Sequence, residues 1–305
     1  FPLVVLEAKR EEKDPLDGKE QARRYAQSQN VRFVILSNGN LHYFWDIERG
    51  NPEIITELPT ETSFRHRSEF KPDNKHLAEE IVEADYIAIT QRPGFKEDPR
   101  YQNEETQEQY LYDEGLRILR PYQVKAIKAL QNVAETGSNR FLFEMATGTG
   151  KTLIAAAIIK LFLRTGNAKR ILFLVDRLEL EDQAHKNFVR YLKNDFTTVI
   201  YKQNRDDWKK AEIVISTVQS LTSQDKYRKL FSPIDFDLVI SDESHRSIGG
   251  NSRAVFEYFI GYKLGLTATP KDYLKKIDPQ KLSNTDPREW ERRQLLDTYV
   301  TFGCA

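Results

Sequence analysis

The sequence predicts an α/β protein with a small mixed sheet near the start of the chain and a larger parallel sheet after it. Within residues 1–60, β-rich runs flank a helix-like segment and a hairpin turn. Beyond residue 118, short apolar runs alternate with helical or loop-like segments, which is typical of a parallel sheet covered on both faces. These runs are residues 141–143, 170–175, 198–201, 213–216, 238–241 and 264–266.

The composition is that of a globular protein long enough for two modest domains, with 305 residues, 39% of them hydrophobic and 30% charged. Lys and Arg total 46, as do Asp and Glu, so any contact with nucleic acid must be local. The single cysteine, Cys304, excludes an internal disulfide, argues against a cysteine-based zinc site and fits a reducing compartment. The longest apolar run, residues 153–163, contains Lys160 and is too short to span a bilayer.

The chain opens at Phe1 without a basic signal segment or an initiator methionine, so we expect residues to be missing upstream. We expect a partial first domain, a proline-punctuated connector, a second domain and the start of a further linker, in residues 1–60, 61–117, 118–275 and 276–305. The connector is expected to carry one helix, residues 75–84, and no chemistry.

The first strand predicts a pair of charged side chains on one face. Alternation along residues 3–9 puts Val5, Glu7 and Lys9 on the same side. A carboxylate that binds a divalent metal, beside an ammonium that stabilises a phosphate, is a workable pair for cleaving a phosphodiester.

A helix is expected to follow, with Asp17 as its N-cap and its end near residue 30. Gln21 and Tyr25 stand four residues apart and therefore share a helix face. Residues 31–36 and 41–46 flank a Ser-Asn-Gly-Asn turn, which predicts a hairpin.

Glu7-Ala8-Lys9 at a strand end, followed by Gln21-x-x-x-Tyr25 on a helix, resembles the PD-(D/E)xK nuclease core of motor subunits of type I restriction enzymes. The resemblance implies that all four of these polar residues are catalytic and that Glu7 is a metal ligand. In that family an aspartate on the preceding strand is a further ligand, and this chain has no such strand before Glu7. A purely structural sheet with a solvated Glu/Lys strand end is the alternative.

A phosphate-binding loop is predicted where an apolar run, a glycine-bearing turn and a helix-like segment follow one another. Glycines let backbone N–H groups approach an anion, and the helix N-terminus adds partial positive charge. Lys151 would reach the terminal phosphates and Thr152 would hold Mg²⁺. The loop reads Met145-Ala146-Thr147-Gly148-Thr149-Gly150-Lys151-Thr152, with Met145 in place of the usual first glycine.

An acidic pair directly follows the apolar run of residues 238–241. Asp242 is placed to hold Mg²⁺, and Glu243 to orient and deprotonate the attacking water. Because parallel strands end at one edge of the sheet, we expect this pair to face the phosphate loop.

These motifs resemble the first RecA-like lobe of superfamily 2 helicases, with Asp242-Glu243-Ser244-His245 matching the DEAD/DEAH motif. The resemblance implies that His245, Thr267 and Thr269 link ATP hydrolysis to DNA, and that Arg177 and Thr217 contact DNA phosphates. Gln123 is the candidate for reading the adenine edge, although a plain surface glutamine is equally compatible with its position. A second lobe with an arginine finger would lie beyond the chain.

The combined resemblance implies an ATP-dependent DNA translocase and endonuclease subunit of a type I restriction-modification system, acting in a prokaryotic cytoplasm. In this chain the nuclease-like segment precedes the motor-like segment, whereas in type III restriction subunits the nuclease follows the motor. The resemblance implies ATP and Mg²⁺ as cofactors. It also implies duplex DNA, a methyltransferase subunit and a specificity subunit as partners. The alternatives are a repair or antiviral helicase with an attached nuclease fold, and a nucleotide- and DNA-binding module with neither activity intact.

Overall fold

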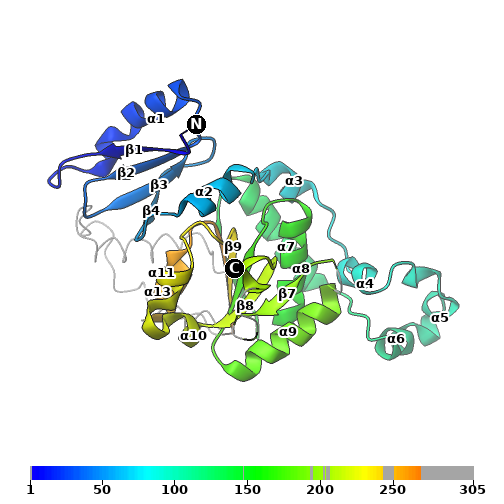
Figure 1. Cartoon of the computed structure of the whole chain (residues 1–305). Coiled ribbons are helices and arrows are strands. Elements are labelled where there is room, and N and C mark those ends of the chain that lie inside the picture. The colour runs from blue at the N-terminus through cyan, green and yellow to red at the C-terminus, as the bar shows by residue number, and fades with distance from the viewer. Residues whose placement is uncertain are drawn as a thin grey trace.

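The computed structural model describes residues 2–146, 148–192, 195–201, 203, 207–242 and 251–268. Its strands form a four-stranded sheet and a six-stranded sheet, which lie in the upper left and the centre of Figure 1. None of the helices in the described ranges is both long and apolar enough to cross a membrane.

The first sheet is mixed, as predicted. Its strands follow the order β1-β2-β3-β4, in which β1 and β2 are parallel and the remaining neighbours are antiparallel. The Asn38 side chain accepts hydrogen bonds from the N–H groups of Asn40 and Leu41, which closes the predicted hairpin between β2 and β3. The elements are β1 (Val4–Ala8), α1 (Lys19–Ser28), β2 (Phe33–Ser37), β3 (His42–Asp46) and β4 (Glu53–Ile55).

The expected N-cap at Asp17 is wrong. Asp14 instead accepts a hydrogen bond from the N–H of Leu16, at 2.8 Å, and begins a 3-10 turn over Pro15–Gly18. Helix α1 starts directly after this turn, and its N-cap Gly18 makes no side-chain hydrogen bond. An Asp followed by Pro supplies a cap and a preset φ angle, which favours the earlier start.

The connector is more structured than the single helix expected for residues 75–84. It contains five α-helices within residues 61–117, each ten residues or shorter, and the one nearest the expected position ends at Glu79. Side-chain oxygens of Thr60, Asp73 and Asn103 cap three of them, so local capping stabilises helices too short to show a clear apolar stripe. The helices are α2 (Glu61–Ser68), α3 (Asn74–Glu79), α4 (Tyr86–Gln91), α5 (Pro99–Gln102) and α6 (Glu104–Asp113).

Helices α4 to α6 form a small projecting unit with a core of its own. Figure 1 shows it extending to the right of the second sheet. Its core contains Ala88, Phe95, Tyr110 and Leu116, and α4 packs against α9 (Leu178–Leu192) of the second domain.

The second sheet is wholly parallel in the order β5-β10-β9-β6-β8-β7, which confirms the predicted RecA-like lobe. Successive residues of β6 face opposite layers, as Ile171 and Leu172 show. One layer contains α7, α8 and α9, and the other α10, α11 and α13. The strands are β5 (Arg140–Glu144), β6 (Ile171–Val175), β7 (Thr198–Ile200), β8 (Ile213–Thr217), β9 (Leu238–Asp242) and β10 (Tyr262–Thr267).

The helices of this lobe lie close to where the sequence places them. Helix α7 begins at Pro121, whose fixed φ angle suits the first helical position, and α8 begins at Lys151. Their bounds are α7 (Pro121–Glu135), α8 (Lys151–Arg164), α9 (Leu178–Leu192), α10 (Val218–Thr222), α11 (Lys226–Leu230) and α13 (Asn251–Tyr258).

The first sheet shares a hydrophobic core with loop residues of the second domain. Helix α1 covers one face of the first sheet, where Ala22 and Ala26 pack with Val5 and Val34. The other face packs on the second domain, because the core there holds the sheet residues Phe33, Ile35, Phe44 and Ile55, Phe64 of α2, and the lobe residues Ile234 and Ile260. The ATPase-like lobe therefore supplies part of the second layer of the first sheet.

A buried carboxylate strengthens this junction. Asp237, just before β9, forms an ion pair with Arg67 of α2 and accepts hydrogen bonds from the N–H groups of Lys169 and Arg170, at 2.8 and 3.0 Å. The Arg67 and Asp237 side chains are only 10% and 9% exposed. One carboxylate thus connects the connector to the beginnings of β6 and β9.

Candidate functional site

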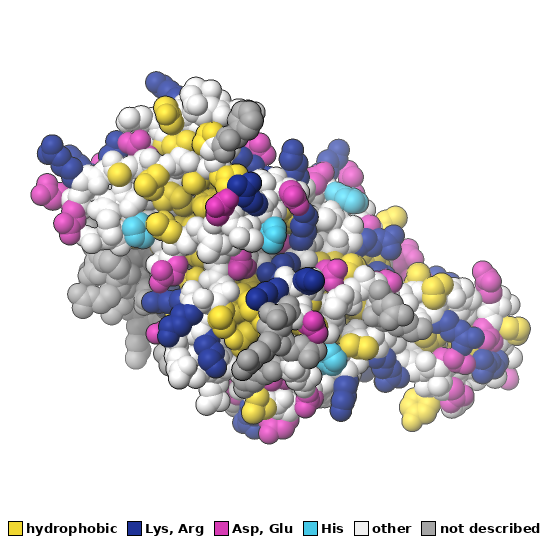
Figure 2. Space-filling view, in the orientation of Figure 1, with side chains coloured by type: hydrophobic (Ala, Val, Ile, Leu, Met, Phe, Trp, Pro, Cys, Tyr) yellow, Lys and Arg dark blue, Asp and Glu magenta, His cyan; other side chains and the backbone are white. Residues whose placement is uncertain are grey.

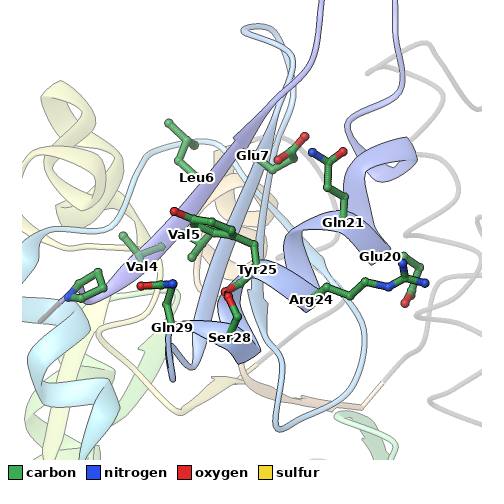
Figure 3. Close-up of a pocket in the computed structure, with 11 residues that line it drawn as sticks. Val4, Val5, Leu6, Glu7, Glu20, Gln21, Arg24, Tyr25, Ser28 and Gln29 are labelled. Atoms are coloured by element: carbon green, nitrogen blue, oxygen red, sulfur yellow. The ribbon is translucent and has the colours of Figure 1, made fainter.

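Glu7, Lys9 and Gln21 come together as the sequence predicts. Lys9 Nζ lies 2.8 Å from Glu7 Oε1, and the two side chains are 19% (Glu7) and 25% (Lys9) exposed. Lys9 Nζ also donates a long hydrogen bond of 3.4 Å to Gln21 Oε1. Figure 3 shows the Glu7 carboxylate and the Gln21 amide facing each other from β1 and α1.

Tyr25 lies one helical turn beyond Gln21 and borders the same cavity. The cavity measures about 850 Å³ and is lined by Glu7, Gln21 and Tyr25 among others. Tyr25 is 60% exposed, and Leu6 of β1 is 61% exposed. Figure 2 shows hydrophobic side chains gathered over the region of the first sheet. The apolar residues Val5 and Leu6 line the same cavity as Glu7 and Gln21, so the lining is partly apolar.

The metal-binding capacity of this site depends on one carboxylate. Across the described residues, no group of three or more His, Cys, Asp or Glu side chains could hold a metal ion. Mg²⁺ keeps several waters and often binds through one or two carboxylates plus substrate phosphates. Glu7 could therefore hold Mg²⁺ only together with water and ligands from a bound molecule, since these side chains alone do not complete a site.

The phosphate loop connects β5 to α8 with glycines in the left-handed backbone region. Gly148 and Gly150 have φ angles of 80° and 84°, which side-chain-bearing residues rarely adopt. Thr149 Oγ1 donates to the carbonyl oxygen of Ala146, at 2.6 Å, and folds the loop back on itself. Lys151 and Thr152 are the first residues of α8, so N–H groups of its first turn are available to an anion. Thr147 lies outside the described residues.

Gln123 braces this loop. It is 1% exposed, so the surface-glutamine alternative is wrong. Its Nε2 donates to the carbonyl oxygens of Thr149 and Gly150, at 3.1 and 3.2 Å, and its Oε1 accepts from the N–H of Arg120, at 2.9 Å. A Cβ on Gly150 would lie 2.7 Å from Gln123 Nε2, so the close approach also requires glycine. Adenine recognition by Gln123 stays a prediction.

Tyr122 is a second contact to the loop, which the sequence reading missed. Its hydroxyl donates to the carbonyl oxygen of Thr149, at 2.6 Å, and the residue is 43% exposed. The only signal in the sequence was its position beside Gln123 on the first turn of α7.

Asp242 and Thr267 lie with the loop at one edge of the sheet. In the register, Thr267 of β10 pairs with Glu144 of β5, and Leu266 pairs with Asp242 of β9. The strand ends that carry Asp242, Thr267 and the phosphate loop are therefore level with one another. Glu243, His245 and Thr269 lie outside the described residues.

The two residues expected to contact DNA differ in their exposure to solvent. Arg177 follows β6, and its side chain is 66% exposed. Thr217 is only 2% exposed, and its Oγ1 accepts from the N–H of Ser220 as the N-cap of α10. Its own N–H donates to the buried Glu181 carboxylate. The burial and the helix cap favour a structural role for the Thr217 side chain, and a phosphate contact by it stays a prediction.

A buried group of charges lies at the opposite end of the same strands. Arg140 of β5 donates two hydrogen bonds to Glu257 of α13, at 2.9 and 2.6 Å, and Lys263 Nζ of β10 lies 3.8 Å from the same carboxylate. Burial acts to raise the pKa of Glu257, but the charges of Arg140 and Lys263 outweigh it and lower the pKa to about 2. Burial, with repulsion from Arg140, lowers the pKa of Lys263 to about 8.

Comparison with known proteins identifies relatives of both domains. Residues 117–272 match the family described as "Type III restriction enzyme, res subunit". The chain is 32% identical over 280 residues to the type I restriction enzyme EcoAI endonuclease subunit of Escherichia coli, covering 89% of this chain and 32% of that protein. It is 31% identical over 175 residues to the type I restriction enzyme SsaAORF53P endonuclease subunit of Staphylococcus saprophyticus, covering 52% of this chain and 18% of that protein.

A solved fragment structure, described as an HsdR subunit of a type I restriction enzyme from Vibrio vulnificus YJ016, aligns with 100% of this chain and 46% of its own. The identity is 25% and the TM-score 0.40. The chain spans 32% of the EcoAI subunit, so it corresponds to a minor part of that relative's length. The chain belongs to the type III restriction enzyme res subunit family, and over most of its length it is homologous to type I restriction enzyme endonuclease subunits.

Proposed function

We propose that this chain is the nuclease and first motor lobe of the endonuclease subunit of a type I restriction-modification enzyme. The subunit hydrolyses ATP to move along duplex DNA and cleaves that DNA. The observation that carries the proposal is the cluster of Glu7, Lys9 and Gln21 on a sheet packed directly against a RecA-like lobe.

At the nuclease site, Glu7 would hold Mg²⁺, which would supply polarisation of the DNA phosphate and a lower pKa for the attacking water. Lys9 places its ammonium where negative charge develops on the phosphate oxygens, and its ion pair with Glu7 fixes its position before DNA arrives. Gln21 orients Lys9, and the exposed Tyr25 contacts the DNA strand beside the scissile phosphate.

At the motor site, backbone N–H groups of residues 148–152 and the Lys151 ammonium bind the ATP phosphates. Thr152 and Asp242 supply oxygen ligands of the kind that Mg²⁺ prefers. We assign Glu243 to orient the attacking water, and Thr267 with His245 and Thr269 to couple hydrolysis to DNA movement.

The proposed partners are duplex DNA, a methyltransferase subunit and a specificity subunit, in the cytoplasm of a prokaryote. Arg177 contributes a phosphate contact, which positions the protein without reading sequence. Target recognition then belongs to the specificity subunit.

The test uses the full-length protein with its partner subunits and a circular DNA carrying the target site. Lys9→Ala is expected to abolish cleavage and leave ATP hydrolysis within about twofold of the wild type, whereas Lys151→Ala abolishes both. Arg10→Ala, which changes a neighbouring basic residue outside the proposed cluster, is the matched control. Continued cutting by the Lys9 variant would remove the nuclease assignment.

A further inference from the structure

Gly18 lies directly against the Glu7–Lys9 pair. It ends the 3-10 turn of Pro15–Gly18, is buried, and immediately precedes α1. A Cβ atom placed on Gly18 would lie 2.7 Å from Glu7 Cγ, 2.8 Å from Lys9 Cε and 3.4 Å from Glu7 Oε1. The first two distances are shorter than real Cβ contacts allow, so any side chain at this position would displace the pair.

The backbone at position 18 does not itself require glycine. Gly18 has φ −87° and ψ −2°, a right-handed conformation open to any residue. Gly39 in the hairpin shows the opposite case, since its φ is 92° and a Cβ there would meet nothing within 4 Å. Space beside Glu7 and Lys9, rather than backbone geometry, therefore explains the glycine at position 18.

The two close contacts are not equivalent. Lys9 Cε is near the end of a flexible side chain and can move at little cost. Glu7 Cγ is one bond from Cβ, so it can move only if Glu7 changes rotamer or β1 shifts. A methyl group at position 18 would therefore act mainly on the carboxylate.

The turn that carries Gly18 is well held. Asp14 caps it through the N–H of Leu16, at 2.8 Å, and the N–H of Lys19 donates to the carbonyl oxygen of Leu16. The turn also packs against both β1 and β2. It cannot move away easily, so a side chain at position 18 would displace Glu7 rather than the turn.

We propose that Gly18 is a positioning residue for DNA cleavage, because its missing side chain leaves the space in which Glu7 presents its carboxylate beside Lys9. This inference rests on the proposed nuclease function. A ligand shifted by a fraction of an ångström binds metal less well, and changes around metal ligands commonly cost about 10–100-fold in affinity or activity.

The first experiment measures DNA cleavage by the full-length enzyme with its partner subunits across a Mg²⁺ titration. Gly18→Ala is expected to lower cleavage by about 10–100-fold and to raise the Mg²⁺ concentration for half-maximal cleavage, with ATP hydrolysis within about twofold of the wild type. Asp17→Ala, an exposed neighbour in the same turn, is the control and should change neither quantity. Unchanged cleavage and Mg²⁺ dependence in Gly18→Ala would overturn the inference.

The second experiment tests the steric cause without any activity measurement. Gly18→Ala should lower the Tm when Glu7 is present and lower it much less in a Glu7→Ala background, where Cγ is gone. An equal loss of Tm in both backgrounds would overturn the steric explanation. If Gly18→Ala alone fails to fold, recovery of folding in the double variant supports the proposal and continued failure overturns it.

The two hypotheses fail in different ways. Wild-type cleavage by Glu7→Ala and Lys9→Ala would overturn the nuclease function itself. Loss of cleavage in both, combined with normal cleavage by Gly18→Ala, would overturn only the role of Gly18.

Discussion

The backbone N–H of Met145 donates to the carbonyl oxygen of Thr267, at 2.7 Å. This bond ties the start of the phosphate loop to the end of β10, the strand between β5 and β9. Neighbouring strands lie about 4.8 Å apart, so the ends of β5 and β9 are roughly 10 Å from each other. The strand that leads into the phosphate loop and the strand that carries Asp242 are thus separated by β10 alone.

Gln123→Ala should weaken nucleotide binding by loosening the phosphate loop. The change leaves the carbonyl oxygens of Thr149 and Gly150 without their Gln123 donor, and an unmade buried hydrogen bond costs about 1–3 kcal/mol. If bracing is the main role, affinities for ATP and GTP fall by similar factors in a fluorescence-binding assay. A selective loss of ATP over GTP would instead assign Gln123 to adenine recognition. Tyr122→Phe, which removes a more exposed bond to Thr149, should have a smaller effect.

Arg67→Ala should weaken the junction between α2 and the second domain, against which the first sheet packs. It leaves the Asp237 carboxylate buried without its ion-pair partner, which typically costs about 3–5 kcal/mol. We expect a lower Tm and faster hydrogen exchange in β2 and β3, which pack at this junction. Arg65→Ala on the same helix removes an exposed pair with Glu61, whose partners are 63% (Arg65) and 69% (Glu61) exposed, and should change stability by less than about 1 kcal/mol. Equal effects of the two substitutions would contradict the proposed junction.

Glu257 should make stability depend on acid pH. Its pKa is lowered from 4.5 to about 2 in the fold, so the unfolded chain binds more protons between these values. The stabilisation is present above pH 4.5 and is lost as the pH falls towards 2. The free energy of unfolding of the wild type, measured in urea, should therefore fall more steeply as the pH drops over this range than that of Glu257→Gln. Parallel pH profiles would show that the carboxylate is not held in its charged form.

Arg177→Ala should mainly affect DNA binding, and Thr217→Ala should mainly affect stability. Removing the exposed Arg177 guanidinium should weaken DNA binding and reduce its salt dependence, with little change in Tm. Removing the Thr217 cap of α10 should cost about 0.5–2 kcal/mol of stability and leave the salt dependence of DNA binding unchanged. A lower salt slope for the Thr217 variant would instead support a phosphate contact by this residue.

The sequence predicts those features that depend on local patterns. Buried strands such as β6 and β9 are continuous apolar runs, and the Asn38–Gly39 turn carries its own hairpin signal, so both sheets could be predicted. Apart from the helix expected at residues 75–84, the short connector helices could not, because they depend on caps such as Thr60 and Asn103 and on tertiary packing.

Contacts between residues far apart in the chain could likewise not be predicted from the sequence. Gln123 reaches a loop 26 residues away, and the role of Gly18 appears only when β1 and the 3-10 turn are placed together. The cap that Thr217 forms at the start of α10 was not predicted, because Thr217 was singled out only by resemblance to a DNA-contacting motif.

The most direct test of the central claim, that the parallel-sheet edge binds a nucleotide's phosphates, is calorimetric titration of the 305-residue chain with an ATP analogue and Mg²⁺. We predict measurable binding by the wild type and a loss of at least about tenfold, or about 1.4 kcal/mol, in Lys151→Ala. Equal affinity of the two proteins, or no binding by the wild type, would contradict the claim.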